Sequence, residues 1–166
     1  MSKIGIFYGS STGNTQDAAE TIANMLEVAP SDVHDVSSAS ADFFGYDVLL
    51  FGSSTWGIGD LQDDWEGFIG KASSADLAGK KIALFGCGDS SSYSDSFCDA
   101  VGKIHQAIEG KGCTIIGKLS SDGYSYSSSE AFVDGELVGL LLDIENESSK
   151  VEERISAWVN QLKSEI

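Results

Sequence analysis

Short apolar runs alternate along this chain with segments in which apolar residues recur every three or four positions. The short runs contain almost no polar residues, which is typical of strands buried on both faces of a parallel sheet. They occupy residues 4–8, 48–52, 82–86 and 114–119, with a weaker run at 33–36. The pattern predicts the strands of a parallel sheet.

The other segments predict helices, because their apolar residues fall on one face at helical spacing. They cover residues 19–26, 60–69, 97–108 and 151–162. Gly110 and Gly112 end the third, and Ser149 with Glu152 has the spacing of a capping box before the fourth. Alternating strands and helices predict a doubly wound α/β sheet, with Trp158 in its core.

One segment interrupts this alternation. Residues 120–138 are rich in Ser, Gly, Tyr and Asp, and they follow the fifth apolar run without a helix. An apolar run then resumes at residues 140–142. We interpret the segment as an insertion, at about residues 120–139, that splits the fifth strand of a single domain spanning residues 1–166.

The first strand leads into a loop of small residues that opens a helix, Gly9-Ser10-Ser11-Thr12-Gly13-Asn14-Thr15. Hydroxyl and backbone N–H groups at a helix N-terminus form an anion site, which phosphate often occupies. No lysine or arginine lies between Lys3 and Lys71, so neutral donors must hold the anion. This favours a small, enclosed monoester over a nucleoside triphosphate. The alternative, a helix cap without a ligand, needs one hydroxyl, whereas this loop has four.

Two more loops follow the third and fourth strands. Their sequences are Ser53-Ser54-Thr55-Trp56-Gly57-Ile58-Gly59-Asp60 and Gly86-Cys87-Gly88-Asp89-Ser90-Ser91-Ser92-Tyr93. Each places one aromatic ring among small residues. Because ligands of doubly wound sheets bind beyond the carboxyl ends of the strands, Trp56 and Tyr93 are predicted to form walls for a flat ring beside the phosphate.

Taken together, in this order and at this spacing, the three loops resemble those of the flavodoxins, electron carriers that contain FMN. The likeness rests on Ser10, Thr12, Gly13 and Thr15, on the tryptophan loop with residues 61–65, and on Gly86, Gly88, Asp89 and Tyr93. It includes Asp122-Gly123-Tyr124 and residues 138–143 around the insertion, which is similar to the long-chain subgroup. It implies a five-stranded parallel sheet of order 2-1-3-4-5 with helices on both faces.

The resemblance also implies which residues hold FMN. The phosphate would be bound by Ser10, Ser11, Thr12, Gly13, Asn14 and Thr15. Trp56 and Tyr93 would sandwich the isoalloxazine, and Cys98 would lie near its pyrimidine side. Its polar edge would bond to backbone groups of Gly57, Ile58, Gly88 and Asp89. The remaining expected contacts are Ser54, Thr55, Gly59, Cys87 and Phe97, and Asp143 and Glu145 are expected near the ribityl chain.

Two positions depart from the family pattern. Ser54 stands where a proline is frequent, which is expected to loosen the approach to Trp56, and Cys98 stands where a glutamine is common.

The chain is strongly acidic, with a formal charge of -16 from 26 acidic and 10 basic residues. Such a surface repels nucleic acid and anionic membranes and attracts basic proteins, although the charge by itself equally serves solubility. The three cysteines lack metal-ligand spacing and suit a reducing compartment, and neither a signal peptide nor a membrane-spanning run is expected. We expect a cytoplasmic monomer whose partners, a reductase donor and an acceptor enzyme, have basic docking surfaces.

Acidic residues also surround both aromatic loops. Asp60, Asp63, Asp64 and Glu66 follow Trp56, Asp89 and Asp95 flank Tyr93, and no base lies between Ile82 and Gly102. Several carboxylates about 10 Å from a flavin anion would lower the potential of the fully reduced couple by roughly 100 mV. Together with the resemblance, this predicts a low-potential one-electron carrier, not an enzyme, that shuttles between the semiquinone and hydroquinone of non-covalently bound FMN.

A flavin-dependent quinone or nitro reductase on the same fold is the alternative function. It needs an open pocket over the flavin, whereas Trp56 and Tyr93 would cover both ring faces. A phosphate-binding signalling module of receiver-like fold is a third class. It needs acidic residues where the first strand ends, and Gly9-Ser10-Ser11 is not acidic.

Overall fold

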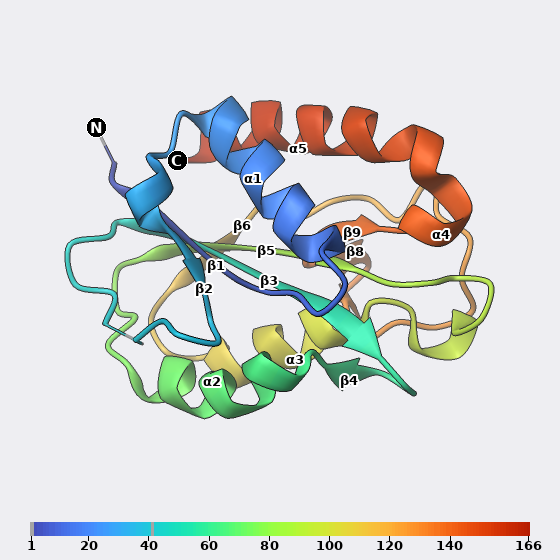
Figure 1. Ribbon diagram of the computed structural model, residues 1–166, viewed down its shortest axis with the longest axis horizontal. Coiled ribbons are helices and arrows are strands. Elements are labelled where there is room, and N and C mark those ends of the chain that lie inside the picture. The colour runs from blue at the N-terminus through green and yellow to red at the C-terminus, as the bar shows by residue number, and fades with distance from the viewer. Residues whose placement is uncertain (1, 41) are drawn as a thin grey trace.

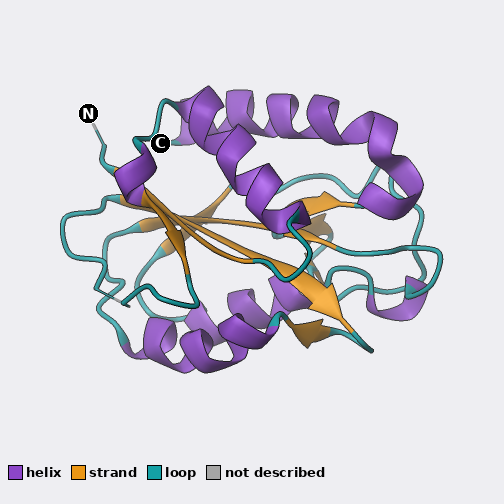
Figure 2. Ribbon diagram, in the orientation of Figure 1, coloured by secondary structure: helices purple, strands orange, loops and turns teal. Residues whose placement is uncertain are grey.

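A parallel sheet forms the centre of the computed structural model, which describes residues 2–40 and 42–166. Its main strands are β1 (Ile4–Gly9), β2 (Val33–Asp35), β3 (Val48–Trp56), β5 (Lys81–Cys87) and β6 (Thr114–Ile116). Neighbouring strands are parallel in the order β2-β1-β3-β5-β6, which confirms the predicted five-stranded order. The interior strands are buried along most of their length, because helices cover both faces of the sheet (Figure 2), and β3 becomes exposed only at its end, from Ser54 to Trp56.

The fifth strand is split, as predicted. Its first half, β6, pairs with Lys81–Ala83 of β5, and its second half, β9 (Gly139–Leu142), pairs with residues 84–87 of the same strand. The insertion between the halves contains a small hairpin of β7 (Phe132–Val133) and β8 (Glu136–Leu137). Gly139 is required at the junction, since a Cβ there would lie 2.1 Å from the carbonyl oxygen of Leu84.

Two helices cover each face of the sheet (Figure 1). On one face lie α1 (Asn14–Leu26) and α5 (Val151–Glu165), which bury Ile22 and Trp158 completely. On the other lie α2 (Asp63–Ser74) and α3 (Asp99–Ile108), packed over a cluster that includes Phe51 and Trp65. Within the described residues, none of the helices has the length and apolar character needed to cross a membrane.

The predicted helix at residues 60–69 begins later than expected. Asp60 and Leu61 form a short strand, β4 (Asp60–Leu61), that pairs antiparallel with the end of β3. Gly57 and Gly59, at φ 52° and 88°, turn the chain back. Helix α2 starts at Asp63 because Gln62 caps it, its side-chain oxygen accepting the N–H groups of Asp64 and Trp65.

The predicted capping box at Ser149 is wrong. A short helix, α4 (Ile144–Glu147), and a 3-10 turn, η3 (Ser148–Lys150), lead directly into α5. Lys150, which precedes α5, already has helical torsion angles, and no side chain caps the helix. The chain thus enters α5 from a preceding turn, which leaves Ser149 no capping position.

Two other elements are shorter than predicted. Helix α3 starts at Asp99 rather than Phe97, after a 3-10 turn, η2 (Ser94–Ser96), and a left-handed Cys98. Strand β6 ends at Ile116 because Gly117 has a φ of 74°. A further 3-10 turn, η1 (Pro30–Asp32), leads into β2.

Candidate functional site

The three loops singled out in the sequence meet where β1, β3 and β5 end, the edge at which doubly wound sheets bind ligands. Between them lies a cavity of about 340 Å³, within the range of small-molecule sites. Its lining includes these predicted residues: Thr12, Asn14, Ser54, Thr55, Trp56, Gly57, Cys87, Gly88, Asp89 and Tyr93.

The loop after β1 leaves several donors without partners. Gly13 caps α1 in a left-handed conformation and makes no side-chain capping bond, so the first N–H groups of the helix lack an acceptor within it. The Ser10 hydroxyl accepts the N–H of Gly13 at 3.1 Å and shapes the loop. The Thr15 hydroxyl is fully buried and has no hydrogen-bond partner among the described residues. This combination suits an anion.

Gln62 holds this loop through a side-chain hydrogen bond. Its amide nitrogen donates to the Ser11 hydroxyl at 3.1 Å and to Asp64, while its oxygen caps α2. Gly9 permits the contact, since a Cβ there would lie 2.3 Å from the Gln62 oxygen. Gln62 falls inside the helix predicted at residues 60–69, and its sequence context indicates no role of its own. Its role depends on α2 packing beside β1.

Trp56 forms one wall of the cavity at the end of β3. Its indole N–H donates to the Ser54 hydroxyl at 2.8 Å, so Ser54 orients the ring rather than leaving it loose. The Thr55 hydroxyl accepts the N–H of Ala100 at 3.2 Å, which joins this strand end to α3. Trp56 keeps 40 % of its surface exposed. An exposed indole held at its edge is available for stacking.

Tyr93 forms a second wall, on the loop after β5. Its backbone N–H donates to the carbonyl of Asp89 at 2.9 Å, and 44 % of the surface of the residue is exposed. The Asp89 carboxylate accepts the N–H groups of Ser91 and Ser92, both at 3.1 Å. The structure therefore brings both predicted aromatic rings to one cavity.

Cys87 and Gly88 line the cavity, and Cys98 lies behind them. A Cβ on Gly88 would lie 2.8 Å from the sulfur of Cys98, so this glycine lets the strand end approach α3. Burial is the main cause that raises the pKa of the Cys87 thiol to about 11. Burial likewise raises the pKa of Cys98. Both are therefore neutral, unreactive thiols at physiological pH.

Other predicted site residues do not line the cavity. Ser10, Ser11, Gly13 and Thr15 form or lie behind the loop after β1. Ile58 points outward with 87 % of its surface exposed, and Gly59 is buried against Asp99. Phe97 is buried with Cys98 and stacks on Tyr126 of the insertion, at a ring separation of 5.5 Å.

Two lining residues come from the segment after β9. Ile144 and Glu145 lie on α4 and complete the lining of the cavity. Glu145 was expected there, but Ile144 was not. No local pattern around Ile144 indicates a site, and only the split strand brings it to this edge. Asp143 itself is fully buried and accepts hydrogen bonds from Ser90 and Asn146.

One cation reaches the acidic tryptophan loop from a distant segment. Lys103, on α3, lies 3.8 Å from the carboxylate of Asp60. The Asp60 carboxylate in turn lies 3.1 Å from where a Cβ on Gly57 would be. The charge beside Gly57 is thus partly balanced, which the absence of nearby basic residues in the sequence did not indicate.

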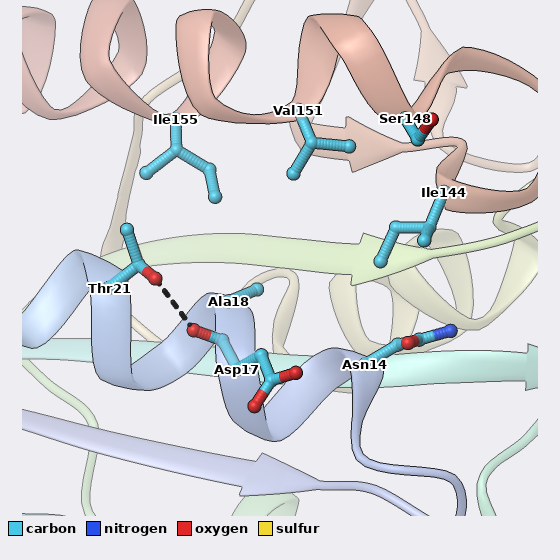
Figure 3. A pocket seen from close by; sticks show the side chains of 8 residues that line it. All are labelled: Asn14, Asp17, Ala18, Thr21, Ile144, Ser148, Val151 and Ile155. Atoms are coloured by element: carbon cyan, nitrogen blue, oxygen red, sulfur yellow. Dashed lines mark hydrogen bonds between the residues drawn. The ribbon is translucent and has the colours of Figure 1, made fainter.

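A second hollow, of about 230 Å³, adjoins this cavity and shares Asn14 and Ile144 with it. Figure 3 shows it between α1 and α5, with Val151 and Ile155 facing Ala18. The hydroxyl of Thr21 is turned back onto the carbonyl oxygen of Asp17 at 2.9 Å. Its lining has no aromatic side chain and one carboxylate, so it suits neither a flat ring nor an anion.

A family model described as Flavodoxin matches residues 6–158. A flavodoxin of Trichodesmium erythraeum is 45 % identical, with 99 % of this chain and 98 % of the relative covered. Flavodoxin 1 of Escherichia coli strain K12 is 40 % identical, with 100 % and 96 % covered.

Among solved structures, a Fusobacterium nucleatum flavodoxin bound to flavin mononucleotide is similar to this one, with a TM-score of 0.92 and 27 % identity. The match covers 100 % of this chain and 99 % of that one. Matches of this extent, on a fold and cavity of this form, show that the chain belongs to the flavodoxin family.

Proposed function

We propose that this protein is an electron carrier that binds FMN non-covalently in the cavity between Trp56 and Tyr93 and passes single electrons between other proteins. The observation that carries the proposal is the meeting of two exposed aromatic rings and the N-terminus of α1, which no side chain caps, around one cavity. Family membership and the FMN-bound flavodoxin of similar fold support it. When bound, FMN supplies the redox chemistry, and the protein sets its position and surroundings.

The loop after β1 suits the phosphate of FMN. The N–H groups at the start of α1 and the hydroxyl of Thr12 are neutral donors, and the helix dipole favours negative charge there. A buried hydroxyl without a partner costs about 1–3 kcal/mol. The Thr15 hydroxyl is such a group, and an anion at this loop would give it an acceptor. We therefore assign Ser10, Ser11, Thr12, Gly13, Asn14 and Thr15 to the phosphate.

The two aromatic walls suit the isoalloxazine. Stacking on a flat heterocycle contributes about 1–3 kcal/mol for each ring, judged from nucleic-acid bases. Gly57, Gly88 and Asp89 line the same cavity, and we assign their backbone groups to the polar edge of the flavin. Ser54, Thr55 and Cys87 complete the lining. Ile58, Gly59, Phe97 and Cys98 are assigned supporting positions around it.

The surface around the cavity suits protein partners of opposite charge. The net charge of the chain is -16, and Trp56, Ile58 and Tyr93 are exposed beside the cavity. A basic partner surface would be attracted over long range and could then cover these apolar side chains. We infer that donor and acceptor are redox proteins with basic docking surfaces that bind a monomer. The three free cysteines fit action in the reducing cytoplasm.

Titration of the protein without cofactor tests the proposal. FMN should lose its fluorescence on binding, and riboflavin, which lacks the phosphate, should bind more weakly. Partial reduction of the complex should populate a stable one-electron-reduced flavin, with negligible NADPH turnover in the presence of quinones or nitro compounds. Unquenched FMN would overturn the proposal, and steady turnover would favour the reductase alternative.

A further inference from the structure

A cluster of polar side chains joins the Tyr93 loop to the short helix α4. Asn146, on α4, donates its side-chain N–H groups to the carboxylates of Asp89 and Asp143, both at 2.8 Å. Asp89 lies at the start of the Tyr93 loop, and Asp143 directly follows β9. One exposed amide therefore ties together two segments that are 57 residues apart in the chain.

Asp143 is the buried centre of this cluster. It is completely shielded from solvent, and it takes part in none of the ion pairs in the described part of the chain. Burying a carboxyl group that has no ion-pair partner is costly unless its oxygens accept hydrogen bonds. The donors are the hydroxyl of Ser90, the backbone N–H of Asn146 and one side-chain N–H of Asn146. Asp143 consequently holds Ser90, in the Tyr93 loop, against Asn146.

Asp89 connects Asn146 to Tyr93 through hydrogen bonds. The oxygen that accepts from Asn146 also accepts the N–H groups of Ser91 and Ser92, and the Asp89 carbonyl accepts the N–H of Tyr93. The hydrogen bond from Asn146 is the main cause of a lowered pKa at Asp89, so this carboxylate is charged at neutral pH. The turn before Tyr93 is thereby fixed from α4.

We propose that Asn146 and Asp143 are positioning residues for the Tyr93 wall, which hold its ring in the stacking geometry before the cofactor binds. The proposal rests on the proposed function, because it assigns the wall to FMN. Ordering a loop in advance removes a cost that the ligand would otherwise bear, so it raises affinity without adding a contact. Neither Asn146 nor Asp143 lines the cavity. We therefore expect their effect on FMN to pass through the residues that they hold, Asp89 and, through its carbonyl, Tyr93.

A double-mutant cycle on FMN affinity tests this route. The four proteins are wild type, Asn146→Ala, Tyr93→Ala and the double variant, measured by quenching of FMN fluorescence. Asn146→Ala should weaken FMN binding about tenfold in the wild-type background and less than about twofold when Tyr93 is already alanine. Asn160→Ala is the matched control, since Asn160 is an exposed asparagine on α5.

Equal losses in the two backgrounds would overturn the proposal, because a general structural defect would not depend on the Tyr93 ring. Failure of the wild-type protein to bind FMN would instead overturn the proposed function. Thermal unfolding midpoints of the four proteins, taken without cofactor, show whether each is folded. The visible circular dichroism of bound FMN should change in Asn146→Ala and not in Asn160→Ala.

Asn146→Asp gives a second, charge-based arm. The new carboxylate would face Asp89 and Asp143, while the nearby cations Lys150 and Arg154 are already paired with Glu147. Repulsion should weaken FMN binding more than Asn146→Ala does, and added salt should reduce that loss. Asn160→Asp, which adds the same charge elsewhere, should follow the wild-type salt dependence. A salt dependence of Asn146→Asp equal to that of the wild type would contradict the proposed positioning role.

Discussion

The two aromatic walls of the cavity are held in different ways. The Trp56 wall ends a strand, and the turn beyond it relies on two glycines at positive φ, with Ile58 exposed between them. The indole itself is oriented by a single hydrogen bond to Ser54. The Tyr93 wall lies on a loop that hydrogen bonds hold at both ends. Asn146 holds one end through Asp89, and Ser94 accepts the N–H groups of Ser127 and Ser128 at the other.

This difference indicates that the two walls have different roles around a redox cofactor. The turn at Gly57 can change its backbone conformation, because glycine populates both signs of φ at little cost. The Tyr93 loop cannot change without breaking several hydrogen bonds to charged groups, each contributing about 1.5–3 kcal/mol. We infer that the Trp56 side responds to the redox state of the flavin and that the Tyr93 side supplies a fixed surface.

Removal of either ring should have the largest effect on affinity. Trp56→Ala and Tyr93→Ala should each weaken FMN binding about 5- to 150-fold, the equivalent of one lost stack. The measurement is the dissociation constant from fluorescence quenching. Phe replacements are the controls, since they keep the stacking surface, and should recover most of the affinity. Comparable losses in the Ala and Phe variants would show that stacking is not what these residues supply.

Replacement of Gly57 should change the yield of one-electron-reduced flavin rather than the stacking surface that Trp56 supplies. A β-branched residue at φ 52° is strained by about 1–3 kcal/mol, and its Cβ would crowd the Asp60 carboxylate. Gly57→Val should therefore lower the fraction of one-electron-reduced flavin during stepwise reduction, followed by visible absorbance. Gly57→Asn tolerates the left-handed conformation and should retain more of it. Gly123→Val, in open space at φ 87°, is the remote control. An unaltered yield in Gly57→Val would refute the responsive turn.

Charge changes beside the Trp56 wall should have smaller effects, of tens of millivolts. One unit charge roughly 10 Å from the flavin shifts the fully reduced couple by at most about 70 mV at an effective dielectric near 20, before salt screening. Lys103→Gln removes the cation beside Asp60 and should lower that potential. The pair Asp63→Asn and Asp64→Asn should raise it. Lys163→Gln, on the far end of α5, should leave it unchanged. Spectroelectrochemical titration measures the direction of each shift in potential. Identical shifts in all three variants would contradict the electrostatic explanation.

Ser54 shows how a residue can be located from sequence while its role stays hidden. Its place before Trp56 is evident from the loop sequence, and the departure from proline suggested a looser approach to the ring. In the structure its hydroxyl accepts the indole N–H. Sequence spacing predicts that two residues are close, but side-chain torsion angles decide whether they bond.

Local patterns determined much of this protein by themselves. Uninterrupted apolar runs specify strands buried on both faces, and a small-residue loop before a helix specifies donors for an anion, because both depend on neighbours in the chain. The split fifth strand was also readable, since its two apolar halves flank a polar segment. These features located the edge of the sheet and most of the cavity lining.

Only the tertiary structure decided which distant groups support that cavity. Gln62 reaches Ser11, Lys103 reaches Asp60 and Asn146 reaches Asp89 across 51, 43 and 57 positions of the chain, respectively. Each of these contacts depends on how crossover connections place one element beside another, which no local pattern encodes. The same holds for the start of α2, where a β-hairpin with β3 took Asp60 and Leu61 from the expected helix. A long-range pairing there outweighed the local helical preference.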